Sequence, residues 1–168
     1  MGLPMLMKPV YHSHLVERIR RLFGAPACRL QVAALPWHRT ASGAIEIMLI
    51  TSRDTGRWVL PKGWPEDSER LCETAAREAS EEAGLSGSVD THEAGRYFYT
   101  KELGSGERVA CEVLVYPLEV RKVAEKWKER RQRTRKWVSP AEAARMVNEP
   151  DLCRLISSFG AAHGKVAA

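Results

Sequence analysis

The chain has 168 residues, of which 44% are hydrophobic and 28% are charged, and its formal net charge is +5. This length and composition are those of one globular domain with a sizeable core, and no apolar run is as long as a membrane span. The apolar start, residues 1–9, lacks the basic residues and the long apolar stretch of a secretory signal. The positive charge suits nucleic acid or a small anionic ligand. No RNA-binding signature with interleaved aromatic residues is present, so nucleic acid is not the expected partner.

An amphipathic helix is predicted near the N-terminus, over residues 13–23. Leu15, Ile19, Leu22 and Phe23 form one apolar stripe at helical spacing, and charged residues occupy the opposite side. We expect this stripe to pack against the rest of the chain. The alternative is a contact with a partner or with a second copy, so the protein is expected to be a monomer or a homodimer.

Two β-strands are predicted next, over residues 28–37 and 45–52. The second strand, IEIMLITS, is mostly apolar and is therefore expected in the centre of a sheet. A turn at residues 53–56 and a short apolar run at 58–60 then lead to the segment Pro61-Lys62-Gly63.

The second half of the chain alternates strands and helices. A turn at Gly104-Ser105-Gly106 separates two strand patterns, and Ser139-Pro140 is a strong helix start, with a serine N-cap and a proline in the first helical position. The predicted elements are strands at 96–101, 109–118 and 136–138 and helices at 140–147 and 151–159. This order predicts a single domain, residues 1–168, built as an α/β/α sandwich in which helices cover a mixed β-sheet.

Four cysteines are scattered along the chain as Cys28, Cys72, Cys111 and Cys153. They form no CxxC pair, so neither a zinc site nor a disulfide framework is indicated. Reduced, mostly buried thiols in a cytoplasmic protein are the expectation.

A further helix is predicted between Ser68, a suitable N-cap, and Gly84, a glycine of the kind that ends helices. Glu78, Glu81 and Glu82 fall within about one third of its circumference. Like charges one turn apart destabilise a helix, and a hard divalent cation such as Mg²⁺ or Mn²⁺ would offset the repulsion. The alternative is a solvated acidic helix face.

The frame around these glutamates is more specific than the acidic cluster itself. The spacing of Gly63, Glu69, Arg77-Glu78, Glu81-Glu82 and Gly84-Leu85 resembles the Nudix box at every defined position. The resemblance covers about residues 28–159, which leaves a short helix in front of the domain. It implies the Nudix fold, a mixed β-sheet sandwiched between helices, in agreement with the predicted order of elements.

The resemblance also implies a reaction and a role for each residue of the box. The family hydrolyses nucleoside diphosphates linked to another moiety, and related pyrophosphates, with Mg²⁺ (or Mn²⁺). Glu78 and Glu82 would be the main metal ligands, with the backbone carbonyl of Gly63 adding another. Glu81 would ligate a metal or act as the catalytic base. Glu69 and Arg77 would brace the loop and the catalytic helix.

A second, finer resemblance concerns the substrate. The segments Thr51-Ser52-Arg53, Trp58–Pro61 and Arg133–Val138 resemble the diphosphoinositol polyphosphate phosphohydrolase branch of the family. The branch contacts phosphates with residues that match the following positions here: Arg29, Ser52, Arg53, and Arg133 or Arg135. Arginine suits bidentate phosphate binding. The alternative for the late basic segment is a solvated loop.

The sequence departs from that branch immediately before the box. Pro61-Lys62-Gly63-Trp64 replaces a glycine triplet, and Pro-Lys-Gly is common in diadenosine polyphosphate hydrolases. Lys62 could also contact a phosphate. The expected function is metal-dependent hydrolysis of a pyrophosphate bond in a polyphosphorylated small molecule, either a diphosphoinositol polyphosphate or a dinucleoside polyphosphate. The alternatives are hydrolysis of nucleotide sugars or nucleoside triphosphates, or a catalytically silent binding module.

Overall fold

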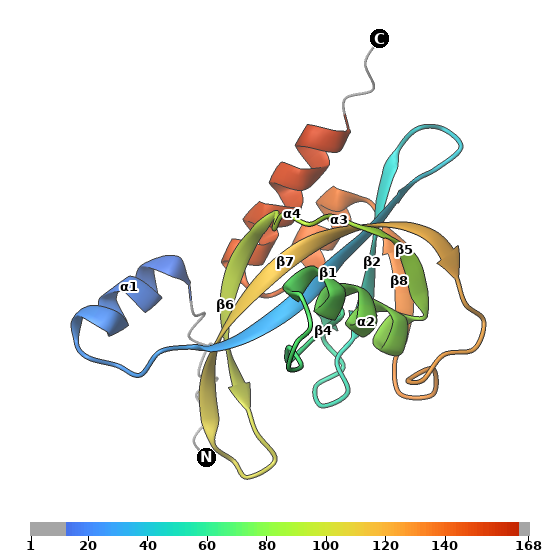
Figure 1. The fold of residues 1–168 in the computed structure, drawn as a ribbon. Helices are drawn as coiled ribbons and strands as arrows, with labels where there is room; N and C mark the ends of the chain where they lie inside the picture. The colour runs from blue at the N-terminus through green and yellow to red at the C-terminus, as the bar shows by residue number, and fades with distance from the viewer. Residues whose placement is uncertain (1–12, 165–168) are drawn as a thin grey trace, which may run out of the picture.

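The computed structural model describes residues 13–164, so the expectation for residues 1–9 lies outside the described residues. The described residues form four helices and eight strands (Figure 1). In chain order these are α1 (His14–Leu22), β1 (Arg29–Arg39), β2 (Ile45–Thr51), β3 (Trp58–Val59), β4 (Lys62–Gly63), α2 (Leu71–Ala83), β5 (Leu85–Val89), β6 (Gly95–Glu102), β7 (Arg108–Val123), β8 (Arg135–Val138), α3 (Pro140–Met146) and α4 (Pro150–His163).

The eight strands form one mixed sheet around the long strands β1 and β7. The main path is β3-β2-β1-β7-β5, with β4 paired to β1, β6 paired to β7 and β8 paired to β2. The β1–β7 pair is parallel and the other pairs are antiparallel. Strand β1 changes partner along its length, because its residues Val32 and Ala33 pair with β4 and its residues from Trp37 onward pair with β2. This change of partner brings Lys62 and Gly63 next to the middle of β1.

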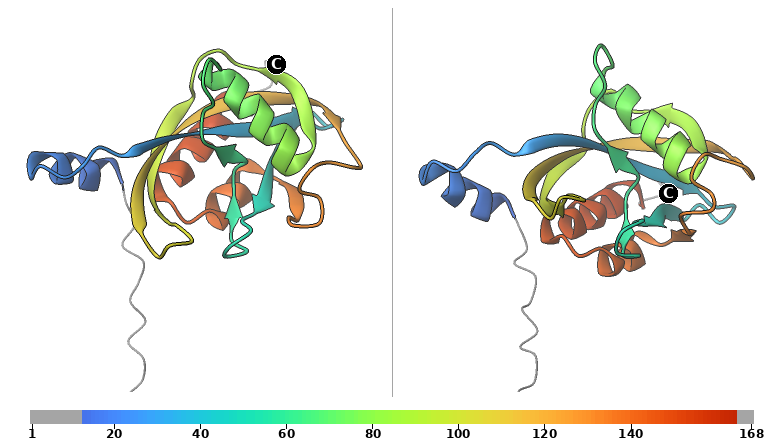
Figure 2. Two further views of the ribbon diagram at one scale, coloured as in Figure 1. Left: turned by 60° about the horizontal axis from the view of Figure 1, so that its bottom comes forward. Right: turned by 90° about the horizontal axis from the view of Figure 1, so that it is seen from below.

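Helices cover both faces of the sheet, as the sequence predicts (Figure 2). Alternate residues of β1 point to opposite faces. Val32 and Ala34 pack with α2, whereas Ala33 and Leu35 pack with α3 and α4. The side of α2 that faces the sheet is made of small residues: Cys72, Ala75, Ala79 and Ala83. Because these side chains are short, the helix lies close to the sheet.

The start of α2 differs from the prediction. Ser68 is not the N-cap: its φ of 70° places it in the left-handed region, and the helix begins at Leu71. The carboxylate of Glu73 accepts the backbone N–H of Arg70, the N-cap residue, at 3.0 Å. The end is as predicted, because Gly84 adopts φ 67° at the C-cap.

Two other elements are longer than predicted. Strand β7 continues to Val123, beyond the predicted end at residue 118, because its backbone pairs with β5 as far as Leu85. Helix α4 continues to His163, beyond the predicted end at residue 159. A Cβ on Gly160 would lie 2.4 Å from the Pro140 Cβ, so this glycine allows α4 to pack tightly on α3.

Helix α1 forms as predicted but does not pack as predicted. Leu15, Ile19, Leu22 and Phe23 are all exposed, with Phe23 86% accessible, so the expectation of a packed stripe is wrong for this chain by itself. The helix projects from the body of the molecule (Figure 2). It contacts that body at His14, whose backbone N–H donates to the Asp151 carboxylate at 2.8 Å. None of the helices formed by residues 13–164 has the length and apolar character needed to span a membrane.

Candidate active site

Glu78 lies where α2 comes closest to β4. An ideal Cβ built on Gly63 would lie 2.1 Å from Glu78 Oε1, so a residue with a side chain could not occupy this position without displacing the carboxylate. The carboxylate is 8% exposed and accepts a hydrogen bond from Arg77 Nη1 at 2.7 Å. Burial raises the pKa of Glu78, and Arg77 opposes that shift. Gly63 and Arg77 thus hold a desolvated carboxylate beside the sheet.

Glu82, one turn later, lies in a similar environment. It is also 8% exposed, and it accepts the backbone N–H of Lys62 at 3.0 Å and the guanidinium of Arg133. Burial raises the pKa of Glu82, while the positive charges of Arg133 and Lys62 counteract the shift. Two buried carboxylates therefore lie one turn apart on α2, each paired with an arginine.

Glu81 lies on the same helix but pairs with a lysine instead of an arginine. Its side chain is more exposed, and its carboxylate accepts from Lys128 Nζ at 2.7 Å. Among residues 13–164, no three histidine, cysteine or acidic side chains are grouped closely enough to form a ready-made metal site. The donor chemistry of Glu78 and Glu82 nevertheless fits Mg²⁺ or Mn²⁺, because both cations prefer carboxylate oxygens. Both carboxylates are buried and each pairs with an arginine, so this site already accommodates positive charge beside them.

Arg77 connects the loop before α2 to the helix. Its Nε donates to Glu69 at 3.1 Å, and its Nη2 donates to the Trp64 carbonyl at 3.1 Å. Glu69 also accepts from the Thr74 hydroxyl at 2.8 Å, and the hydrogen bond from Arg77 lowers the pKa of Glu69. The structure brings Glu69, Arg77 and Glu78 into one network.

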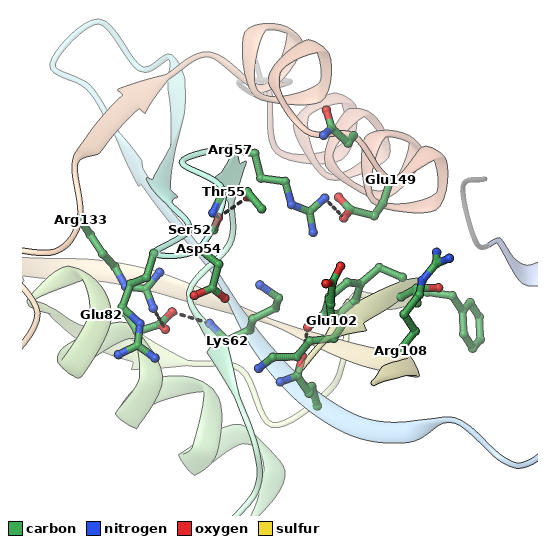
Figure 3. Close-up of a pocket in the computed structure, with 17 residues that line it drawn as sticks. Ser52, Asp54, Thr55, Arg57, Lys62, Glu82, Glu102, Arg108, Arg133 and Glu149 are labelled. Carbon is green, nitrogen blue, oxygen red and sulfur yellow. Dashed lines mark hydrogen bonds and ion pairs between the residues drawn. The ribbon is translucent and has the colours of Figure 1, made fainter. Parts of the chain in front are cut away.

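A cleft of about 340 Å³ opens beside Glu82 (Figure 3). Its walls come from β1, the β2–β3 loop, β4, α2, β6, the start of β7, the loop before β8 and the loop before α4. Its basic side chains are Arg53, Arg57, Lys62, Lys101, Arg108 and Arg133. Because these cations gather beside a buried carboxylate, the cleft suits a ligand with several negative charges.

Four of the six predicted substrate contacts line this cleft: Ser52, Arg53, Lys62 and Arg133. Burial lowers the pKa of Lys62 to about 8, and its ammonium lies 5.3 Å from the centre of the Tyr99 ring. Arg133 is not part of a solvated loop. Its side chain is buried, and it donates to Glu129 at 2.6 Å and to the Thr51 carbonyl at 3.0 Å as well as to Glu82.

The two other predicted contacts lie outside the residues that line the cleft. Arg29 stacks on Trp64, with 4.3 Å between its guanidinium carbon and the ring centre. Arg135 donates to the carbonyls of Ala83 at 2.6 Å and Ala124 at 2.8 Å, and lies over the Trp127 ring. Since its donors satisfy the carboxyl end of α2, Arg135 is a structural residue here and we withdraw it as a phosphate contact.

Other residues that line the cleft were not predicted from the sequence. Arg57, Lys101, Arg108 and Glu149 come from four separate segments that meet only in the folded sheet. The alternation of residues 96–101 could have placed Tyr99 and Lys101 on one face of a strand. Nothing in the sequence indicates that Glu149 joins them, because its position depends on how α3 and α4 pack.

Comparisons with known proteins agree with this geometry. The family model described as the NUDIX domain matches residues 30–156. Nudix hydrolase 12, mitochondrial, of Arabidopsis thaliana is 30% identical over 118 residues, which cover 68% of this chain and 58% of that protein. Two further Arabidopsis Nudix hydrolases are matched over 60% and 54% of their length, so the chain spans a little more than half of these relatives.

Solved structures share the fold at low sequence identity. The crystal structure of a C. elegans Ap4A hydrolase has a TM-score of 0.58 and 20% identity, and the match covers 80% of this chain and 98% of that chain. The NUDIX domain of Shewanella oneidensis NrtR, complexed with ADP ribose, has a TM-score of 0.59 and 17% identity, with coverages of 85% and 96%. At these identities the likeness shows the fold alone.

The bracing network predicts that Arg77→Ala lowers the stability of the protein. The substitution leaves Glu69 and Glu78 without their shared cation and the Trp64 carbonyl without a donor, which should cost roughly 1–3 kcal/mol of unfolding free energy. Urea denaturation of the metal-free protein measures this loss. The matched control is Arg70→Ala on the same helix, whose partner Glu73 is exposed and which should unfold close to wild type. Equal stability of the two variants would contradict a bracing role.

Proposed function

Because the chain belongs to the Nudix family, whose domain model matches residues 30–156, we propose that it is a metal-dependent pyrophosphohydrolase. Its substrate is a polyphosphorylated small molecule. One observation carries the proposal: the buried carboxylate of Glu82 lines a cleft whose other charged side chains are mainly cations. A pyrophosphate substrate needs such an arrangement, because its many phosphate oxygens must be neutralised while one bond is broken.

In this proposal Glu78 and Glu82 hold Mg²⁺ or Mn²⁺, with the Gly63 carbonyl as a further ligand by family resemblance. The bound cation supplies Lewis-acid neutralisation of phosphate oxygens. Arg133 donates a hydrogen bond to Glu82, and its guanidinium would be the donor closest to substrate phosphate if Glu82 held the metal. Glu81, with its more exposed carboxylate, accepts the proton of the attacking water.

The substrate proposal rests on the cleft. Arg53 is more than half exposed at its mouth, and Lys62 lies farther inside. A chain of several phosphates can contact both at once, whereas a substrate with two phosphates needs fewer cations. Diphosphoinositol polyphosphates and dinucleoside polyphosphates are the two candidate classes. Both are polyanions, so the cleft charge by itself supports them equally.

The proposed reaction is tested by Glu82→Gln, which keeps the shape of the side chain and removes its charge. Turnover of Glu82→Gln, measured as phosphate release from a panel of pyrophosphate substrates at saturating Mg²⁺, should fall about a hundredfold or more. Glu73→Gln, on an exposed acid of the same helix, should retain wild-type turnover. Near-full activity of Glu82→Gln would refute the metal assignment. A wild-type protein that hydrolyses no member of the panel would instead indicate a binding module.

The polyphosphate preference is tested by Arg53→Ala. Arg53 makes long contacts of 3.4 Å to Glu129 and Gln132, so its guanidinium is available to a ligand. KM for a diphosphoinositol or dinucleoside polyphosphate should rise about tenfold with a smaller change in turnover, and higher salt should mimic the substitution. A nucleotide sugar should be little affected. Arg131→Ala, an exposed arginine that does not line the cleft, is the matched control. The same change on every substrate would argue against a polyphosphate preference.

A further inference from the structure

Glu149 is a buried carboxylate with one unused oxygen. The residue is 4% exposed and lines the cleft. One of its oxygens, Oε1, accepts from Arg57 Nη1 at 2.6 Å. The other, Oε2, has no hydrogen-bond partner among residues 13–164. Buried polar atoms in native proteins are nearly always paired, so an unpaired carboxylate oxygen in the wall of a cleft points to a missing donor.

The position of Glu149 in its helix makes the unused oxygen more notable. Glu149 is the N-cap of α4, where a carboxylate normally accepts backbone N–H groups of the first turn. Its side chain makes no such bond, and Pro150 supplies no N–H in the first helical position. The carboxylate is directed into the cleft, where Arg57 holds it in place (Figure 3).

The two ends of the cleft differ in the carboxylate that each one presents, because Glu82 has both oxygens hydrogen-bonded whereas Glu149 has one unpaired oxygen among residues 13–164. Figure 3 shows Glu82 and Glu149 well apart, with Lys62 between them. At the Glu82 end Arg133 is paired with Glu82 and Glu129, and Arg53 makes only long contacts of 3.4 Å. At the other end Arg57 is paired with Glu149, and Arg108 lies on the same side of the cleft (Figure 3). A carboxylate repels phosphate but accepts hydrogen bonds from neutral hydroxyl or amino groups.

We propose that Glu149 and Arg57 form a subsite that binds the nucleoside of a nucleotide substrate through its hydroxyl or amino donors. This inference rests on the proposed function and selects between its two substrate classes. A dinucleoside polyphosphate places a neutral, donor-rich group at the end of its phosphate chain. A diphosphoinositol polyphosphate places further phosphates there, and these meet the Glu149 carboxylate unfavourably. Asn148, which also lines this end, adds an amide that can bind the same moiety.

The test is Glu149→Gln, which keeps a carbonyl for Arg57 and replaces the free oxygen by an amide group that donates. KM for diadenosine tetraphosphate should rise about tenfold, with turnover changed less than threefold. KM for a diphosphoinositol polyphosphate should stay constant or fall. Diinosine tetraphosphate, which lacks the adenine amino group, and the 2′-deoxy analogue distinguish the two donor sources. The analogue without the bound donor should show the variant's KM already in the wild type.

A control variant and a second test variant accompany Glu149→Gln. Glu142→Gln makes the same charge change on α3, outside the residues that line the cleft, and should behave as wild type. Asn148→Ala probes the same subsite without touching the Arg57 pair and should also raise KM for diadenosine tetraphosphate. It therefore tests the subsite even if Glu149→Gln is unstable. An unchanged KM in both Glu149→Gln and Asn148→Ala would overturn the subsite. A loss of turnover on every substrate with KM unchanged would overturn it too, and would assign Glu149 to the chemistry.

Failure of the subsite can be separated from failure of the proposed function. Calorimetric titration with AMP, in the absence of metal, measures binding of a nucleoside monophosphate without any reaction. Wild type should bind AMP about tenfold more tightly than Glu149→Gln. Equal affinities would reject the nucleoside subsite even if the protein hydrolyses pyrophosphates. A difference in affinity would support the subsite even if no hydrolysis is found.

Discussion

The burial of two carboxylates one turn apart on α2 is the constraint on which the rest of the structure depends. Glu78 and Glu82 are desolvated and repel each other, so the surrounding chain must compensate. Arg77 and Arg133 supply the positive charge, and the Lys62 backbone supplies an N–H. The small residues of α2 and the bare backbone of Gly63 make room for this arrangement against the sheet. Larger side chains on α2 would hold the helix farther from the sheet and leave both carboxylates in water.

Local patterns were sufficient to predict the frame of this site but not its surroundings. The spacing from Gly63 to Gly84 fixed the glycine, the acids and the bracing arginine, because all of them lie on one helix and the turn before it. Periodicity located the strands and the α/β/α layers. It could not show that the stripe of α1 stays exposed, since that depends on whether the sheet offers a surface to cover it. It also could not separate Arg133 from Arg135, two residues apart, which reach a carboxylate and a carbonyl of α2 respectively.

The pairing of the charged residues along the cleft is not visible in the composition of the chain. A formal net charge of +5 indicates an anionic ligand but does not show where its charged part would bind. In the structure, Arg53 near α2 is only weakly paired, whereas Arg57 is neutralised by Glu149 at the far end. Such an asymmetric site orients a molecule that is anionic along one part and neutral along another. The residues responsible come from the β2–β3 loop and the start of α4, so only the tertiary fold assembles them.

Binding of Mn²⁺ tests whether the buried carboxylate pair on α2 is a divalent-metal site. Electron paramagnetic resonance of free Mn²⁺, titrated with substrate-free protein, gives the affinity without any dependence on turnover. If the pair is such a site, Glu78→Gln should bind Mn²⁺ about tenfold or more weakly than wild type, because one charged oxygen ligand is lost. Glu73→Gln, on the exposed first turn of the same helix, should bind Mn²⁺ with wild-type affinity. Equal Mn²⁺ affinity in wild type and Glu78→Gln would show that the buried pair does not bind the metal.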